Sequence, residues 1–242
     1  FAPDPNIPSP SSDAVTATDS VPSIPLRPQP WTVREMDSLE FLVARYTDGA
    51  TGMQAPRSSG YGRRGGRNLR TAEQGGDPVL SAKFLGTELP WTRFYEANGN
   101  VVDMDDYRSR SKVVLVVLRG FAREVCVYCV TQTEALCDSV EEFKKLNCEV
   151  FVVYPGERNR LEVFMESFKK VSKHMGEPPI GVLYDRNMEL VSRMGIASEF
   201  AIPSTFVLDE SGVIRYSYVG EDIDDRPAAN DVLEAIKGMA TP

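Results

Sequence analysis

The run KVVLVVL at 112–118 is the strongest constraint on the fold of this chain. Six of its seven residues are apolar and no polar position alternates with them, a pattern typical of a strand covered on both faces. Such a strand lies in the middle of a sheet between two layers of helices. The rest of the chain must therefore supply helices for both faces.

Buried strands and helices alternate after this run. The spacing of apolar residues predicts helices at about 130–146 and 158–174, with a second buried strand, CEVFVVY, at 148–154 between them. GVLYD and a short helix near 187–194 follow. This alternation implies parallel strands joined by right-handed crossovers.

Two hairpins frame this central part. Asn98-Gly99 is a strong turn signal within 93–104, and a second turn is predicted at Asp209–Gly212 within 204–220. A last helix is expected at about 228–239. Because hairpin strands are antiparallel, the sequence predicts an α/β fold of three layers, α/β/α, with a central mixed β-sheet.

The composition changes at about residue 85. Residues 1–30 are rich in Pro, Ser and Ala, and residues 55–70 hold five arginines among glycines. We therefore expect residues 1–85 to be a largely disordered tail or linker that includes one short helix at 31–46. The globular domain is expected over residues 86–242.

Charge and termini bear on partners and location. The 242-residue chain has a formal net charge of -8, which argues against broad nucleic-acid binding. No apolar run reaches membrane-spanning length, so no transmembrane segment is predicted. The chain starts with Phe1 rather than Met, from which we expect an exported or periplasmic protein whose signal or anchor has been removed. A cytoplasmic location stays open.

The stretch EVCVYCV carries the candidate chemistry. It places Cys126 and Cys129 where the loop after the central strand meets the next helix. Free N–H groups and the helix dipole favour an anion there, which lowers the pKa of a thiol. The spacing lets the second thiol close a disulfide with the first. We therefore predict Cys126 as the nucleophile and Cys129 as the resolving thiol, with Arg119 and Arg123 as candidates for tuning the thiolate.

The alternatives to a redox pair are a metal site and a pair of unreactive cysteines. A metal site needs about four ligands, but a second C-X-X-C is absent and His174 is the sole histidine of the chain. We predict neither a metal nor a cofactor. A structurally buried, unreactive pair is the other alternative. Cys137 and Cys148 are interpreted as small buried hydrophobes, with a resolving role for Cys137 as an alternative.

Two stretches resemble one known family. VVLVVLRGFAREVCVYCVTQTEAL resembles the peroxiredoxin-like branch of the alkyl hydroperoxide reductase/thiol-specific antioxidant (redoxin) family, which has a thioredoxin fold. That branch shows an apolar strand, Arg-Gly, then Cys-Pro-Tyr-Cys and a helix, and Arg119-Gly120 and Cys126-Val127-Tyr128-Cys129 stand in those places. AIPSTFVLDESGVIRYSYVG is similar to a later stretch of the same family. The resemblance covers residues 86–242.

The resemblance also implies a substrate site. It implies a cis peptide bond before Pro203 that faces the cysteine pair. Such a bond would expose the backbone of Ile202 for pairing with an extended thiol substrate. Tyr128, between the two cysteines, is a further candidate for substrate binding.

The family label and the site residues point to different reactions. Typical peroxiredoxins have a Thr three residues before the reactive Cys and an Arg near the later strand, where this chain has Arg123 and Pro203. We therefore predict a thiol-disulfide oxidoreductase that acts on a protein or small-molecule disulfide, with an unidentified reductase as electron donor. A thiol peroxidase that reduces hydrogen peroxide or alkyl hydroperoxides is the alternative. A redox-silent binding protein that uses the Arg/Gly-rich segment 57–67 is a third hypothesis.

Overall fold

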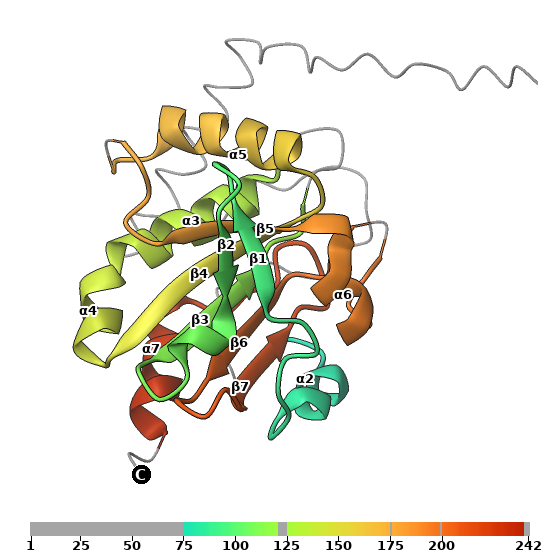
Figure 1. Ribbon diagram of the computed structural model, residues 1–242, viewed down its shortest axis with the longest axis vertical. Coiled ribbons are helices and arrows are strands. Elements are labelled where there is room, and N and C mark those ends of the chain that lie inside the picture. Colours follow the sequence, from blue (N-terminus) through green and yellow to red (C-terminus); the bar gives the residue numbers. More distant parts are fainter. Residues whose placement is uncertain (1–74, 121–124, 175, 199, 240–242) are drawn as a thin grey trace, which may run out of the picture.

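The computed structural model describes residues 75–120, 125–174, 176–198 and 200–239 (Figure 1). The predictions for the first 74 residues, including the helix at 31–46 and the segment 57–67, lie outside these residues, as does the prediction for Arg123. Within the described ranges, no helix is both long enough and apolar enough to cross a bilayer.

Seven strands form one mixed sheet in the order β2-β1-β5-β4-β3-β6-β7. Its centre is parallel, because β3 pairs with β4 and β4 with β5 in the same direction, while all other neighbours are antiparallel. The strands are β1 (Arg93–Glu96), β2 (Val101–Asp103), β3 (Lys112–Val117), β4 (Cys148–Pro155), β5 (Gly181–Asp185), β6 (Ser204–Leu208) and β7 (Ile214–Val219).

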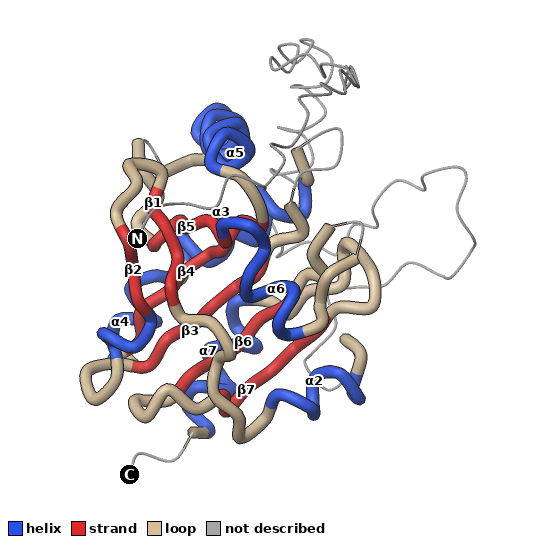
Figure 2. The backbone as a smooth tube through the Cα atoms, turned by 45° about the vertical axis from the view of Figure 1, so that its right-hand side comes forward, coloured by secondary structure: helices blue, strands red, loops and turns tan. Residues whose placement is uncertain are grey.

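Helices cover both faces of this sheet (Figure 1; Figure 2). On one face pack α3 (Val127–Asp138), α4 (Val140–Lys145), α5 (Arg158–Val171) and α7 (Ala229–Gly238). On the other pack α2 (Pro78–Phe84), α6 (Glu189–Met194) and the 3-10 turns η1 (Met104–Tyr107) and η2 (Arg186–Met188). Strand β3 sends alternate side chains into the two cores, so the predicted three-layer α/β/α arrangement with a mixed sheet is confirmed.

The helix predicted at 130–146 is two helices. Ser139 has φ -100° and ψ 7°, which is not helical, and it ends α3 and starts α4. Its carbonyl accepts the N–H groups of Glu142 and Phe143. The break lets Phe143 turn into the core, where it is fully buried. The spacing of apolar residues over 130–146 does not reveal this break, because it is similar before and after Ser139.

Helix α2 lies before the expected domain boundary at residues 85 and 86. The Asp77 carboxylate accepts the N–H groups of Val79 and Leu80, and Pro78 takes the first helical turn. Phe84 packs edge-on against Phe206 with ring centroids 5.6 Å apart. The packed part of the chain therefore starts several residues earlier than the composition indicates.

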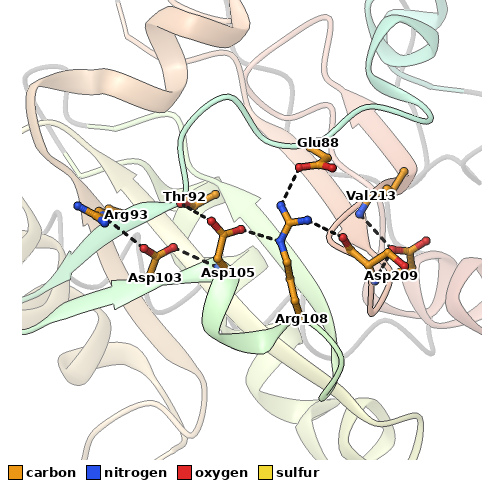
Figure 3. Close-up of polar contacts among 9 residues, drawn as sticks. Glu88, Thr92, Arg93, Asp103, Asp105, Arg108, Asp209 and Val213 are labelled. Carbon is orange, nitrogen blue, oxygen red and sulfur yellow. Dashed lines mark hydrogen bonds and ion pairs between the residues drawn. The ribbon is translucent and has the colours of Figure 1, made fainter.

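Arg108 braces the end of the sheet where β3 starts (Figure 3). Its guanidinium donates to the carboxylates of Glu88 and Asp105 and to the carbonyl of Ser211. These groups come from three separate segments. The contacts of Arg108 stabilise one end of the sheet, and the cysteines follow β3 at the opposite end.

Candidate active site

The cysteine pair lies where β3 ends and α3 begins. Gly120, in the connection, has φ +90°, and an added Cβ would stand 2.8 Å from Cγ of Pro155, so this position requires glycine. Cys126 is the N-cap residue of α3 and is half-buried, whereas Cys129 is 1% exposed. The structure therefore puts both sulfurs at a helix N-terminus, as the sequence predicted, with the first nearer to solvent.

A buried arginine missed by sequence reasoning contacts both sulfurs. Nη2 of Arg226 lies 3.4 Å from Sγ of Cys129 and 3.8 Å from Sγ of Cys126. Arg226 is 7% exposed and comes from the loop between β7 and α7. Its Nε donates to the Ile223 carbonyl and its Nη1 to Oε1 of Gln132. Among the described residues, the two sulfurs are the acidic groups in contact with this guanidinium.

The two thiols titrate as a pair. Burial raises the pKa of Cys129, but the hydrogen bond from the Cys126 thiol and the charge of Arg226 outweigh it, and the pKa lies at about 6. The hydrogen bond to Cys129, burial and the negative charge on Cys129 raise the pKa of Cys126. Near neutral pH the reduced pair therefore holds one proton and one negative charge. Arg226 and the Cys126 thiol both favour the charge on Cys129, and the role of Cys126 as the nucleophile stays a prediction.

Arg119 acts through its backbone rather than its charge. Its N–H group lowers the pKa of Cys129, while its guanidinium lies 5.2 Å from the centre of the Phe200 ring. A cation that stacks on an aromatic ring is not aimed at the thiolate. The predicted tuning by the Arg119 side chain is thus replaced by a fixed backbone dipole.

Two tyrosines border the pair. Tyr128 is half-buried, and burial and the nearby Asp224 raise its pKa. Tyr154, at the end of β4, is 2% exposed, and burial together with the charge of the cysteines raises its pKa. The pattern CEVFVVY predicts Tyr154 only as a strand residue, although a phenol at the end of an apolar strand is also a signal for a residue that lines a site.

The stretch around Pro203 differs from the expectation. Every described peptide bond is trans, so the cis bond implied before Pro203 is wrong. The N–H of Ile202 donates to the Ile196 carbonyl, and the carbonyl of Ile202 accepts the Ser204 hydroxyl. The Pro203 carbonyl accepts the N–H of Gly220. These backbone groups are therefore already hydrogen-bonded within the fold and are not free to pair with a substrate.

A model of the family described as Redoxin matches residues 83–233. This chain belongs to the redoxin family. The match covers both stretches on which the resemblance rested, so the predicted membership of the redoxin family is confirmed. It also begins close to α2, in agreement with the early start of the packed part.

Known relatives of this redoxin carry peroxiredoxin names. Bovine peroxiredoxin-2 is 30% identical over 139 residues, which is 56% of this chain and 65% of that protein. A Caenorhabditis elegans peroxiredoxin is 27% identical over 168 residues, or 66% of this chain and 78% of that protein. The solved Plasmodium vivax 2-Cys peroxiredoxin superposes with a TM-score of 0.54 at 13% identity, over 64% of this chain and 81% of that chain. The structural likeness confirms the thioredoxin-like fold.

The loop that presents Arg226 is held by Asp225. The Asp225 carboxylate accepts the N–H of Gly76 at 3.0 Å, the N–H of Glu221 at 2.9 Å and the Tyr218 hydroxyl at 2.6 Å. These bonds join the start of α2, the edge strand β7 and the loop itself. Asp225 therefore supports the position of the neighbouring arginine in the redoxin.

Asp225→Ala is expected to destabilise the redoxin by about 2–3 kcal/mol, because three donors lose a charged acceptor. Urea unfolding of the reduced protein measures this loss. The exposed neighbour Asp222 provides the control, since Asp222→Ala removes an equal charge from the same loop. Equal effects of the two substitutions would show that the bonds of Asp225 are unimportant.

A second polar cluster lies on the far half of α3. Ligand atoms of Glu134, Asp138 and His174 lie within 4.8 Å of one another. Glu134 accepts the Ser172 hydroxyl and the Lys173 N–H, while Asp138 pairs with Lys173 Nζ and with His174. These contacts attach α3 to the segment after α5, and we assign no ligand to the cluster.

Proposed function

We propose that this redoxin is a thiol peroxidase that reduces hydrogen peroxide or alkyl hydroperoxides through Cys126 and Cys129. The observation that carries the proposal is the buried Arg226 guanidinium, 3.4 Å and 3.8 Å from the two sulfurs. A cation beside a thiolate at a helix N-terminus supports a reactive sulfur. A cation beside the reacting sulfur would also stabilise the negative charge that develops on the leaving oxygen of a peroxide.

The trans geometry and the relatives favour peroxide over a disulfide as substrate. The backbone of Ile202 is hydrogen-bonded within the fold, which removes the main support for pairing with an extended disulfide chain. Bovine relatives carry the names peroxiredoxin-2 and mitochondrial thioredoxin-dependent peroxide reductase. Disulfide exchange, the first choice from sequence, thus becomes the second candidate.

The proposed first step oxidises Cys126. The Cys126 thiolate attacks one peroxide oxygen, so that an S–O bond forms and the O–O bond breaks. The leaving oxygen takes a proton and departs as water or an alcohol. Cys126 is left as a sulfenic acid, and the peroxide has received two electrons.

The proposed second step closes a disulfide. The Cys129 thiolate attacks the sulfur of Cys126, the S–S bond forms, and hydroxide leaves and is protonated to water. An external dithiol then reduces the disulfide by exchange through a mixed disulfide. A protein reductase with its own dithiol is the partner that this chemistry requires.

Stoichiometric oxidation of the reduced redoxin tests the proposal. One equivalent of hydrogen peroxide or of an alkyl hydroperoxide should be consumed far faster than by free cysteine at the same pH. Mass spectrometry should then show a Cys126–Cys129 disulfide. Peroxide loss at the rate of free cysteine, together with rapid reduction of insulin disulfides, would favour disulfide exchange instead.

A further inference from the structure

We propose that Gln132 is a positioning residue that holds the Arg226 guanidinium toward Cys129 and thereby decides which of the two sulfurs carries the negative charge of the reduced pair. This inference deepens the proposed function and rests on it for its catalytic meaning. The charge distribution itself is a property of the reduced protein and needs no substrate.

The helix places Gln132 beside the buried sulfur. Gln132 follows Cys129 by three residues on α3, and residues at that spacing are neighbours on one side of a helix. Its Oε1 accepts a hydrogen bond from Nη1 of Arg226, and it is half-buried. Gln132 thus reaches the guanidinium from the helix that carries both cysteines.

Because the guanidinium is rigid, this hydrogen bond also fixes its orientation. The group is planar and its donors form a rigid fork. When Nη1 is held by Gln132, Nη2 is aimed at the sulfurs and lies 0.4 Å closer to Cys129 than to Cys126, as the 3.4 Å and 3.8 Å distances show. The Nε bond to Ile223 stays within the loop of Arg226 itself. Besides the two sulfurs, Gln132 is the side chain of α3 that holds the guanidinium among the described contacts.

Other charged side chains around the pair do not explain why the negative charge lies on Cys129 rather than on Cys126. Tyr154 faces both sulfurs from β4, and its phenol is neutral because burial raises its pKa. Asp224 faces Tyr128 from the Arg226 loop, and a negative group there opposes charge on either sulfur. The charge of Arg160 lowers the pKa of Tyr154 in part. The Arg119 backbone N–H and the Cys126 thiol also favour charge on Cys129. The direction of the Arg226 fork is the charged side-chain contact that treats the two sulfurs unequally.

The arrangement has a chemical consequence for the proposed reaction. With the charge on the buried Cys129, the accessible Cys126 rests as a thiol. Attack on a peroxide then requires that the Cys126 proton passes to Cys129, after which Cys126 carries the reacting electron pair. Cys129 would serve first as a base, pass this proton to the leaving oxygen of the peroxide, and then act as the resolving thiolate.

The test is a pH titration of the reduced protein with isotope-labelled cysteine, in which the Cβ chemical shift of each cysteine is followed by NMR. Cys137 and Cys148, whose pKa burial raises to about 12, serve as internal references. In the unaltered protein, the step at lower pH should appear at Cys129. Gln132→Met, of similar length but without the acceptor, should raise that step by about one pH unit and spread it over both cysteines.

Two further variants separate positioning from a structural role. Gln132→Glu keeps an acceptor, so the step should stay on Cys129 while the added negative charge moves it to higher pH. Asn230→Met makes the amide-to-thioether change on the exposed surface of α7 and should leave both steps in place. If Gln132→Met does not fold, the Gln132→Glu titration decides, since a step that moves to Cys126 in that variant contradicts the proposal. Identical titrations of Gln132→Met and the unaltered protein would overturn it, and a protein inactive toward peroxide would leave this reading intact.

Discussion

Cys126→Ser is expected to lower the rate of peroxide consumption by about three orders of magnitude or more, because it removes the only sulfur of the pair that is open to solvent. Cys129→Ser should behave differently. It should consume one equivalent of peroxide and then stop as a sulfenic acid, since the resolving thiol is absent. Loss of peroxide during turnover and trapping of the sulfenic acid measure the two outcomes.

The remaining cysteines provide a control for this pair of variants. Cys137 is 1% exposed and burial raises its pKa to about 12, so it is a poor nucleophile. Cys137→Ala should therefore keep both turnover and the disulfide. Full activity in Cys126→Ser would remove Cys126 from the mechanism, and a Cys126–Cys137 disulfide would assign the resolving role to Cys137.

Arg226→Met is expected to raise the first thiol pKa of the pair from about 6 toward the ordinary value of about 8.5. At pH 7 a full return to the ordinary value would reduce the thiolate fraction by about 30-fold. Because the hydrogen bond from the Cys126 thiol stays, a smaller fall in the thiolate fraction and in the rate of peroxide consumption is expected. The rate should recover as the pH rises through the new pKa. A pH profile of the second-order rate constant measures the shift. Arg226→Lys keeps the charge but lacks the fork, so an intermediate shift is expected.

The same arginine links stability to pH. Folding lowers the pKa of Cys129 and raises that of Cys126. The contribution of the pair to stability should therefore increase as the pH rises from about 6 to the unfolded thiol pKa of about 8.5, and decrease again above it. Urea unfolding of the reduced protein should show the increase more strongly in the unaltered chain than in Arg226→Met. A flat rate profile and unchanged stability in that variant would show that Arg226 does not tune the thiolate.

Local sequence patterns were sufficient for the sheet and for the position of the cysteines. KVVLVVL has to be covered on both faces, and Asn98-Gly99 has to turn, because these properties depend on a few adjacent residues. The C-X-X-C then falls at a helix start by chain order alone. The cis bond implied before Pro203 failed for the opposite reason, because the conformation there depends on Ile196 and Gly220, which approach only in the folded chain.

Arg226 could not be predicted in the same way. It stands 97 residues after Cys129 and directly follows the acidic run EDIDD, where an arginine is expected to face solvent. Its burial depends on the return of β7 to the sheet and on the three bonds of Asp225. A single basic residue between an acidic run and the last helix was the one sequence signal for it.

The long sequence separation between Arg226 and the cysteines also affects the order in which the site is assembled. Contacts across 97 and 100 residues form only after the last strand has joined the sheet. Until the loop that follows β7 is in place, the cysteine pair lacks the part of the thiolate stabilisation that comes from Arg226. The full acidity of the pair therefore depends on completion of the sheet.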